Sequence, residues 1–367
     1  MSGSSFGKQF VITTWGESHG KGIGVVVDGC PAGLSINEEI IQSYLNRRKP
    51  GTSRLSTQRK ESDSVEILSG VFEGKTTGTS ISMLVRNENE RSVDYSEIAS
   101  AYRPGHADFT FDEKYGFRDY RGGGRSSGRE TIGRVAGGAI ACEILKHLGI
   151  DVLAYTKAIG PITIDYKNYD KDEIQKNPAV MPDALAAAKA VAYLEEQIKN
   201  LDSTGGLIEC VVSGMPTGIG EPVFDKLDAN LAKALMSIGA VKGVEIGDGF
   251  LVAEKHGSEN NDGFMATSTG KIVKKTNHSG GILGGISDGS NLIIRAAIKP
   301  TPSIYSTQDT VNNQRENIQI NIKGRHDPII VPRAVVVVES MVALTIVDLL
   351  FANMSARMDK IIDFYKN

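Results

Sequence analysis

Apolar residues along the chain fall into short runs separated by glycine-rich turns, the pattern of strands that pair through hairpins. Residues 10–15 and 23–27 predict two strands, joined by a loop that carries Ser18 and His19. The same pattern predicts further strands at residues 65–71, 79–85, 152–164, 206–212, 243–252, 291–298 and 318–322. Because strands and helices do not alternate regularly, we expect antiparallel or mixed sheets in an α+β fold.

Longer apolar patterns with helical spacing predict helices between these strands. Asn37 is a suitable N-cap for the first helix, which carries Glu38 and Glu39 in its first turn. Further helices are predicted at residues 183–201 and 224–238, and a last one begins near Pro332, although its β-branched run favours a strand. Residues 260–277 show no such pattern and are predicted to form a loop.

The most distinctive stretch is residues 121–149, RGGGRSSGRETIGRVAGGAIACEILKHLG. Ser127 and Glu130 fit a capping box at the start of a helix, and Gly149 is a suitable stop. The helix contains three glycines that cost about 1 kcal/mol each relative to alanine, which predicts the close approach of another helix or a strand. The three are Gly133, Gly137 and Gly138.

The start of this helix combines free backbone N–H groups with Arg121, Arg125 and Arg129, a combination that attracts phosphate. An ordinary capped helix after a flexible loop is the alternative. The stretch lacks the Gly-Lys-Ser/Thr of a Walker loop, and Ser127 stands where the third glycine of a dinucleotide-binding fingerprint belongs, so both of these phosphate sites are excluded.

Two parts of the chain resemble each other, which predicts an internal duplication. VVVDGCPAGL at residues 25–34 and CVVSGMPTGI at residues 210–219 share Val, Val, Gly, Pro and Gly at equivalent positions. A looser similarity relates residues 69–85 to residues 279–296, in the same order. We therefore predict a single domain over residues 1–367, with related halves at about residues 8–120 and 203–330 joined around the helix within residues 121–149.

Three polar segments are candidates for chemistry. RRKPGTSR at residues 47–54 begins a strongly basic loop, which could bind a small polyanion or form a solvated surface loop. RNA binding is a third interpretation, but the loop lacks the aromatic residues that would stack on bases. His19 lies in a loop between two strands, where a solvated turn histidine is the alternative to a proton donor. His106 lies between Arg103 and Asp108, by chance or as an acid or base.

Composition narrows the class of protein. The net charge of −3 argues against a general nucleic-acid binder, and three scattered cysteines suit a reducing compartment without disulfides. No Cys/His spacing indicates a metal site, and the N-terminal residues have no apolar signal core. The longest apolar run carries Glu339 and Asp348, which favours a buried element over a membrane span. A cytoplasmic enzyme is the expectation.

Eight segments in one order give the chain a close resemblance to the chorismate synthase family. They are GESHG with the following VVVDGCPAG, RRKPGTSR, RPGHAD, GGGRSSGRET, AVKGVEIGDGF, HSGGILGGISDG, KPTPS and GRHDP. The resemblance implies an internally duplicated β-α-β sandwich, with helices packed between sheets, that assembles as a homotetramer. It also implies the conversion of 5-enolpyruvylshikimate-3-phosphate to chorismate and phosphate by a 1,4-anti-elimination. Reduced FMN takes part without net consumption.

The resemblance implies roles for five catalytic residues. His19 matches the histidine that protonates the leaving phosphate, and His106 matches the one that protonates the reduced flavin or limits its charge. Asp327 matches an acid that helps the flavin accept the C6 proton. Ser18 and Ser127 match serines that support the flavin and the histidines.

The resemblance likewise implies binding residues. Those that line the pocket for the substrate anions are Arg48, Arg54, Arg103, Arg129 and Arg325. Arg48 and Arg54 are also connected with NADPH as a possible reductant. Those that contact FMN are Arg125, Ser126, Ser127, Gly239, Ala240, Gly284, Lys299, Pro300, Thr301, Pro302, Ser303 and Arg325.

Three positions depart from the family pattern. Gly239 stands where the family usually has Asn, Pro302 replaces a common serine, and Ile329 replaces a small residue or cysteine. An FMN-dependent oxidoreductase using NADPH is the alternative enzyme, and an RNA-binding protein built on the basic loop is the alternative outside enzymes.

Overall fold

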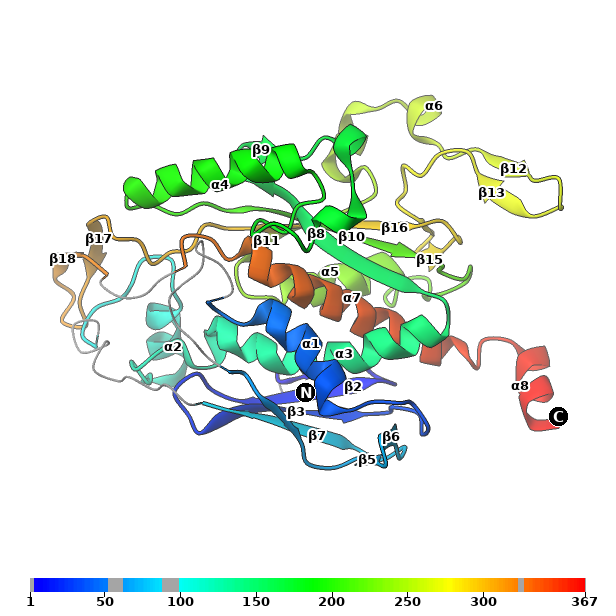
Figure 1. The fold of residues 1–367 in the computed structure, drawn as a ribbon, viewed down its shortest axis with the longest axis horizontal. Coiled ribbons are helices and arrows are strands. Elements are labelled where there is room, and N and C mark those ends of the chain that lie inside the picture. The colour runs from blue at the N-terminus through cyan, green and yellow to red at the C-terminus, as the bar shows by residue number, and fades with distance from the viewer. Residues whose placement is uncertain (1–2, 52–61, 88–98, 323–326, 367) are drawn as a thin grey trace.

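The structure is a computed structural model that describes residues 3–51, 62–87, 99–322 and 327–366. Two five-stranded sheets enclose a layer of helices, with the first sheet below and the second above in Figure 1. This confirms the predicted α+β sandwich. Every strand pair within the described residues is antiparallel, so of the two predicted kinds of sheet the antiparallel one is present.

The strand orders are β1-β2-β3-β7-β4 in the first sheet and β11-β16-β10-β8-β9 in the second. The first sheet consists of β1 (Ser5–Phe6), β2 (Val11–Gly16), β3 (Gly22–Asp28), β7 (Ile81–Arg86) and β4 (Val65–Ile67). The second consists of β11 (Val241–Ile246), β16 (Leu292–Ile298), β10 (Gly206–Ser213), β8 (Asp151–Ile159) and β9 (Ile162–Thr163). Short hairpins are formed by β5 (Val71–Phe72) with β6 (Lys75–Thr76), β12 (Phe264–Ala266) with β13 (Ile272–Lys274), β14 (Ile282–Leu283) with β15 (Ile286–Ser287), and β17 (Gln308–Val311) with β18 (Asn317–Ile320).

Helices α1, α3, α5 and α7 form the middle layer (Figure 1). The helices are α1 (Glu38–Arg48), α2 (Asp108–Tyr115), α3 (Thr131–His147), α4 (Ala184–Lys199), α5 (Leu227–Met236), α6 (Gly257–Asn260), α7 (Val331–Asn353) and α8 (Met358–Lys366). Asn37 caps α1 as predicted, by accepting the backbone N–H of Ile40 at 2.9 Å. The β-branched run of α7 is helical despite its preference for strands, because nearly all of it is buried between the sheets.

The two sheets repeat one arrangement, as the internal similarity predicts. The matched decapeptides begin on β3 and β10, each of which pairs with a later strand that follows a short hairpin, β7 and β16 respectively. Strands β4 and β11 then lie at the outer side of β7 and β16. The second half was predicted to begin at about residue 203. Strand β8, at Asp151–Ile159, also belongs to the second sheet, so this half begins earlier in the chain than predicted.

The glycines of α3, which are unfavourable within a helix, allow a strand and another helix to pack closely against it, as predicted. A Cβ atom added at Gly133 would lie 2.9 Å from Cγ2 of Thr14, and one at Gly137 would lie 2.8 Å from Cγ2 of Ile12, both on β2. A Cβ atom at Gly138 would lie 2.2 Å from Cβ of Ser340 on α7. Helix α3 therefore contacts a strand on one side and a helix on the other.

We expect Gly138→Ala to destabilise the fold by about 1–3 kcal/mol, because the added methyl group has no room between α3 and α7. Urea unfolding measures this change. Gly257→Ala in α6 is the matched control, because a Cβ atom there meets no atom within 4 Å. Equal free energies of unfolding for Gly138→Ala and the wild type would contradict this packing argument.

Several predicted boundaries are wrong because glycines end strands earlier. Residues 65–71 contain β4 and the start of β5, separated by Gly70 with φ +82°. Residues 152–164 contain β8 and β9, separated at Gly160 with φ +50°. Residues 243–252 are not one strand: β11 ends at Ile246, and a 3-10 helix follows at Gly249–Glu254.

Other elements were missed or differ in detail. Residues 260–277 are not a bare loop, because they contain the β12–β13 hairpin. Helices α2 and α8 were not predicted. The capping box is also wrong: Ser127 accepts the backbone N–H of Arg129 at 3.3 Å and caps a 3-10 turn, while Glu130 pairs with Arg134. Helix α3 begins only at Thr131.

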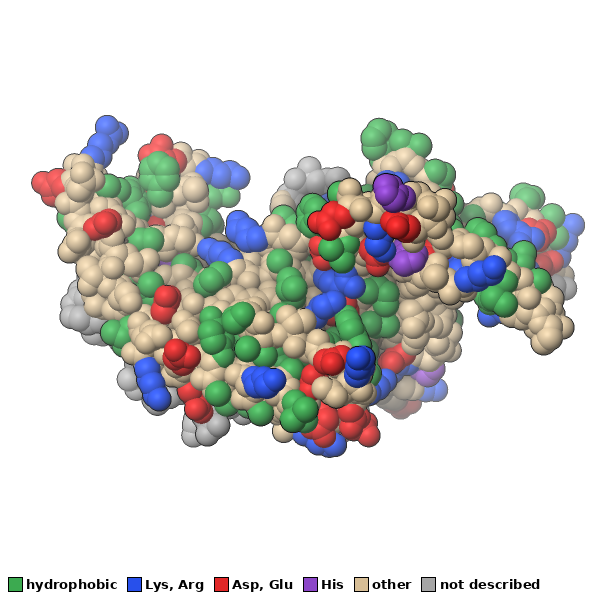
Figure 2. All heavy atoms as spheres, turned by 90° about the horizontal axis from the view of Figure 1, so that it is seen from above, with side chains coloured by type: hydrophobic (Ala, Val, Ile, Leu, Met, Phe, Trp, Pro, Cys, Tyr) green, Lys and Arg blue, Asp and Glu red, His purple; other side chains and the backbone are tan. Residues whose placement is uncertain are grey.

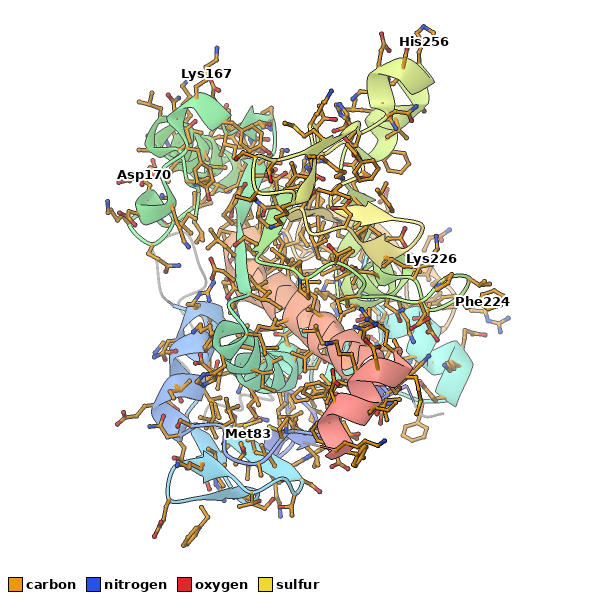
Figure 3. All side chains as sticks on the ribbon, turned by 90° about the vertical axis from the view of Figure 1, so that its right-hand side faces the viewer. Met83, Lys167, Asp170, Phe224, Lys226 and His256 are labelled. Atoms are coloured by element: carbon orange, nitrogen blue, oxygen red, sulfur yellow. The ribbon has the colours of Figure 1, made fainter. Side chains whose placement is uncertain are left out.

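Among the described residues, one helix, α7, is long and apolar enough to cross a membrane, and 83% of its most apolar window is buried inside the protein. It is the core helix of the sandwich. On the face shown in Figure 2, acidic and basic side chains are interspersed over the second sheet and its loops. The end-on view in Figure 3 shows the layers, with Met83 of the first sheet below the helices and Lys167 and Asp170 beyond the second sheet.

Candidate active site

The loop between β2 and β3 carries two predicted catalytic residues. The Oγ of Ser18 lies 3.0 Å from Nδ1 of His19, and Ser18 is buried. The glycine run before α3 packs against this histidine: a Cβ atom added at Gly122 would lie 2.3 Å from Nδ1 of His19. A glycine at this position therefore allows the backbone of the run to approach the imidazole.

Two predicted substrate arginines meet at one buried carboxylate. Asp63, whose side chain is fully buried, accepts from Nη2 of Arg48 at 2.5 Å and from Nη1 of Arg129 at 3.1 Å. Arg48 ends α1 and Arg129 precedes α3, so Asp63 joins the end of α1 to the start of α3. Nε of Arg48 is buried and has no hydrogen-bond partner within the described part of the chain.

A third arginine extends this group from α7. Nε of Arg333 donates to the backbone oxygen of Arg48 at 3.0 Å, and its Nη1 donates to a carboxylate oxygen of Asp327. Asp327, the predicted acid near the flavin, is therefore ion-paired with a residue that also contacts the end of α1. We call Arg48, Asp63, Arg129, Asp327 and Arg333 the arginine cluster.

The arginine cluster contains more positive than negative charge, and this shifts its pKa values. Burial lowers the pKa of Arg48 to about 10; Asp63 opposes this shift, and the guanidinium groups of Arg333 and Arg129 add to it. Burial opposes ionisation of Asp63, but Arg48 and Arg129 hold the pKa of its carboxyl below the ordinary value. Arg48 and Asp63 are therefore both charged at neutral pH, and an incoming anion would relieve the repulsion among the arginines.

Asn87, directly after β7, links Arg129 to the loop that carries His19. Its Oδ1 accepts from Nη2 and Nε of Arg129 at 2.9 and 3.2 Å. Its Nδ2 donates to the backbone oxygens of Glu17 and Gly20 at 2.8 and 2.7 Å. Sequence reasoning missed Asn87, because an asparagine at a strand end gives no signal for contacts with two distant segments.

His106 lies in a second group of predicted residues. Its Nδ1 lies 3.1 Å from the backbone oxygen of Pro104, and its Nε2 lies 3.1 Å from Oγ of Ser303. Lys299 donates to the backbone oxygen of Gly105 at 2.7 Å. The turn before α2 and the Lys299–Ser303 segment, which belong to different halves of the chain, are thus brought together.

Arg103 binds its own turn in this structure. Its guanidinium forms a bidentate pair with Asp108, with both N–O distances at 2.7 Å, and both residues are buried. The pair fixes the first turn of α2 and places a buried positive charge near His106. Burial, then Arg103, and to a smaller degree Lys299 lower the pKa of His106 from 6.5 to about 4.

This shift predicts a pH-dependent stability. Between these two pKa values the unfolded chain binds a proton that the folded chain does not, so stability falls as pH falls. From pH 7 to pH 5 the free energy of unfolding should fall in the wild type, and we expect this fall to be roughly 2 kcal/mol smaller in His106→Gln. Urea unfolding at both pH values measures this difference. Equal losses in the two proteins would show that His106 is not held neutral.

The predicted cofactor segment 125–127 lies beside β2. Arg125 donates to the backbone oxygens of Gly16 and Thr14 at 3.1 and 3.2 Å and to Oγ1 of Thr14 at 2.6 Å. Ser126 is exposed and donates to the backbone oxygen of Gly123. Arg125 therefore holds the glycine run against the end of β2, close to the His19 loop.

The predicted cofactor segment 299–303 lies at the end of β16. Lys299 donates its backbone N–H to Ala240 at 2.9 Å, and Ala240 has φ +73°. Ser203 donates to the backbone oxygen of Thr301, and Oγ1 of Thr301 is buried without a hydrogen-bond partner among the described residues. A ligand with polar atoms would find a hydroxyl group here.

Residues 203–205 connect this segment to the arginine cluster. The backbone N–H of Thr204 donates to Pro328, next to Asp327, and a Cβ atom at Gly205 would lie 3.2 Å from Cδ of Pro300. Ile329, one of the departures, is buried in the core. Pro302, another departure, packs against the turn of His106, because a Cβ atom at Gly105 would lie 2.7 Å from Cβ of Pro302.

Not every predicted residue joins these groups. Gly284 lies in the β14–β15 hairpin before β16, whereas Lys299 follows that seven-residue strand, which is about 20 Å long. Gly239 is adjacent to Ala240, and a Cβ atom there would meet open space. Arg54 and Arg325 lie outside the described residues. No group of metal-ligating side chains occurs in the described part of the chain.

A duplicated β-α-β sandwich with arginines at the ends of its core helices and histidines in the adjoining loops is suited to an enzyme that acts on an anionic substrate. Comparison with known proteins gives the particular family. The family model described as chorismate synthase matches residues 10–351, and the chain belongs to the chorismate synthase family.

Curated relatives of this chain cover almost the whole of its length. It is 70% identical to the chorismate synthase of Lachnoclostridium phytofermentans over all of both chains. It is 54% identical to that of Methanosarcina mazei, over 95% of this chain and 96% of the relative. A solved structure entitled "Crystal Structure of Chorismate Synthase" is 29% identical, covers 98% of this chain and 97% of its own, and superposes with a TM-score of 0.77.

Proposed function

We propose that this chain converts 5-enolpyruvylshikimate-3-phosphate into chorismate and phosphate by a 1,4-anti-elimination that needs reduced FMN and is redox-neutral overall. Membership of the chorismate synthase family supports the activity in general terms. The observation that carries the specific reaction is the arginine cluster next to the His19 loop. A phosphate ester with two carboxylates needs several cations, and guanidinium groups bind such anions with paired hydrogen bonds.

Arg48 and Arg129 provide the fixed part of the substrate site. Both are buried and share Asp63, which orients their guanidinium groups and leaves the pair with a net positive charge. Nε of Arg48 remains as a buried donor with no partner in the described residues. A bound anion would offset the net positive charge and accept a hydrogen bond from Nε of Arg48. We therefore infer that the arginine cluster binds the phosphate or a carboxylate of the substrate.

His19 is placed to supply a proton to the departing phosphate. The contact between Oγ of Ser18 and Nδ1 orients the imidazole, and we infer that this ring donates the proton. A leaving phosphate is a better leaving group when it accepts a proton as the C–O bond breaks. Gly122 allows the backbone to lie close to the ring, because a Cβ atom there would lie 2.3 Å from Nδ1.

The residues near His106 fit a flavin with a phosphate group. Thr301 offers a buried hydroxyl group without a protein partner in the described residues, and Lys299 and Ser303 offer polar groups beside His106. When bound, reduced FMN supplies the electron density that a redox-neutral elimination of this kind requires. Ala240 and residues 125–127 are the further protein groups that we propose to contact FMN.

His106 enters this site as a neutral imidazole. Burial, and then Arg103 and Lys299, disfavour its protonated form, and an anion that binds nearby would offset the two charges and favour protonation. We infer that His106 limits the negative charge of a bound reduced flavin by a hydrogen bond or a proton transfer that depends on cofactor binding.

The proposal is tested by anaerobic mixing of the protein with 5-enolpyruvylshikimate-3-phosphate. We expect chorismate and phosphate to form with reduced FMN and not without flavin. Formation of a product with a changed oxidation state would favour the alternative of an NADPH-dependent oxidoreductase. A cytoplasmic location, assembly as a homotetramer, and NADPH as the source of electrons for the flavin remain predictions.

A further inference from the structure

We propose that Asn87 is a positioning residue that fixes the catalytic loop of His19 relative to the anion-binding guanidinium of Arg129. This inference rests on the proposed function of both residues. Asn87 was not among the residues that the sequence or the family resemblance indicated, and it need not touch the substrate to act.

The two halves of the Asn87 amide serve two different segments. Its oxygen accepts two N–H groups of Arg129, at 2.9 and 3.2 Å. Its nitrogen donates to the backbone oxygens of Glu17 and Gly20, at 2.8 and 2.7 Å, and so binds the loop of His19 on both sides. Only an amide side chain offers an acceptor and two donors in this arrangement, because a carboxylate lacks the donors and an aliphatic group lacks both.

The backbone of Asn87 strengthens the link. Its N–H donates to the backbone oxygen of Lys21 at 3.2 Å, directly after Gly20. The neighbouring Arg86 still pairs with Gly22 in the first sheet, so the position of Asn87 is set by the sheet itself. The loop, which connects the ends of β2 and β3, is thus also anchored to the end of β7.

The geometry of the reaction explains why such a link matters. The proton donor and the cation that holds the substrate anion must be in fixed relation, because small displacements of a catalytic group reduce the rate strongly. Asp63 sets Arg129 from one side through Nη1, and Asn87 sets it from the other through Nη2 and Nε. Through Asn87 the same guanidinium is tied to the loop of His19.

Asn87→Asp removes one set of hydrogen bonds and keeps the other. The carboxylate still accepts from Arg129, but it cannot donate to the backbone oxygens of the loop. We expect kcat at saturating 5-enolpyruvylshikimate-3-phosphate with reduced FMN to fall at least 10-fold, and KM to rise as well, because the new carboxylate adds a negative charge beside Arg129. Asn177→Asp is the matched control. Asn177 also donates to two backbone oxygens, those of Glu173 and Met181 at 2.7 and 2.8 Å, but in the loop before α4.

A double-mutant cycle distinguishes positioning of His19 from a general structural effect. If Asn87 acts through the loop of His19, Asn87→Asp should lower kcat by less than about 3-fold in a His19→Ala background. Thermal unfolding of each variant confirms that it is folded. Wild-type kcat in Asn87→Asp, or equal fold-losses with and without His19, would overturn the proposal. A wild-type protein that forms no chorismate would overturn the proposed function instead.

Discussion

His19→Ala is expected to lower kcat by about 10²–10⁴-fold, the usual contribution of a general acid, while FMN and substrate still bind. Asn87 links the loop of this imidazole to the arginine cluster, and alanine at this position cannot transfer the proton that we propose His19 supplies. His147→Ala, at the exposed end of α3, is the control and should retain wild-type turnover. Stopped-flow measurement of chorismate formation under anaerobic conditions gives kcat for both variants.

Near wild-type turnover by His19→Ala would remove this residue from the mechanism. A parallel loss in His147→Ala would show that the effect comes from the fold and not from the site.

Arg48→Lys is expected to weaken binding of 5-enolpyruvylshikimate-3-phosphate by roughly 10–100-fold, the loss of one charge-assisted hydrogen bond. Lysine keeps the charge but lacks the planar fork that reaches Asp63 and the anion together. Isothermal titration with the enzyme and FMN measures the dissociation constant.

The adjacent residue is the matched control for this change. Arg47 faces away from the site and forms a bidentate pair with Glu339 at 2.6 and 2.9 Å. Arg47→Lys should lower stability without changing substrate affinity. Equal affinities of Arg48→Lys and the wild type, or equal losses in both variants, would show that Arg48 stabilises the fold and does not bind the substrate.

Local chemistry predicted much of the middle layer. Asn37 caps α1 as expected, and the costly glycines of α3 indicated close packing that Thr14, Ile12 and Ser340 provide. These features depend on short-range geometry, which the residue types themselves specify. The internal similarity likewise predicted the repeated sheets, because equivalent turns direct equivalent strand pairings.

Features that depend on distant contacts were not predictable in the same way. Helix α2 is short and lacks an apolar face, and it is fixed by the Arg103–Asp108 pair. Asp63 and Asn87 have no distinguishing pattern in the sequence, since their partners lie in other elements. The predicted capping box at Ser127 does not form, because Glu130 pairs with Arg134, one helical turn further on.

The site itself was predicted in part. The structure brings Ser18, His19, Arg48 and Arg129 into one network and His106 with Lys299 and Ser303 into another. Gly284 lies in the β14–β15 hairpin, and none of the hydrogen bonds described above connects it to either network. The contacts of the predicted residues with ligands remain predictions, because spacing along the chain does not determine where a ligand lies.

The central claim is that a flavin takes part in a reaction with no net redox change. Its most direct test is the amount of chorismate formed per reduced FMN after a single anaerobic chemical reduction. We predict many turnovers per flavin, equal amounts of phosphate and chorismate, and a flavin that is still reduced at the end. Oxidation of one reduced flavin or one NADPH for each product would contradict the account and favour the oxidoreductase.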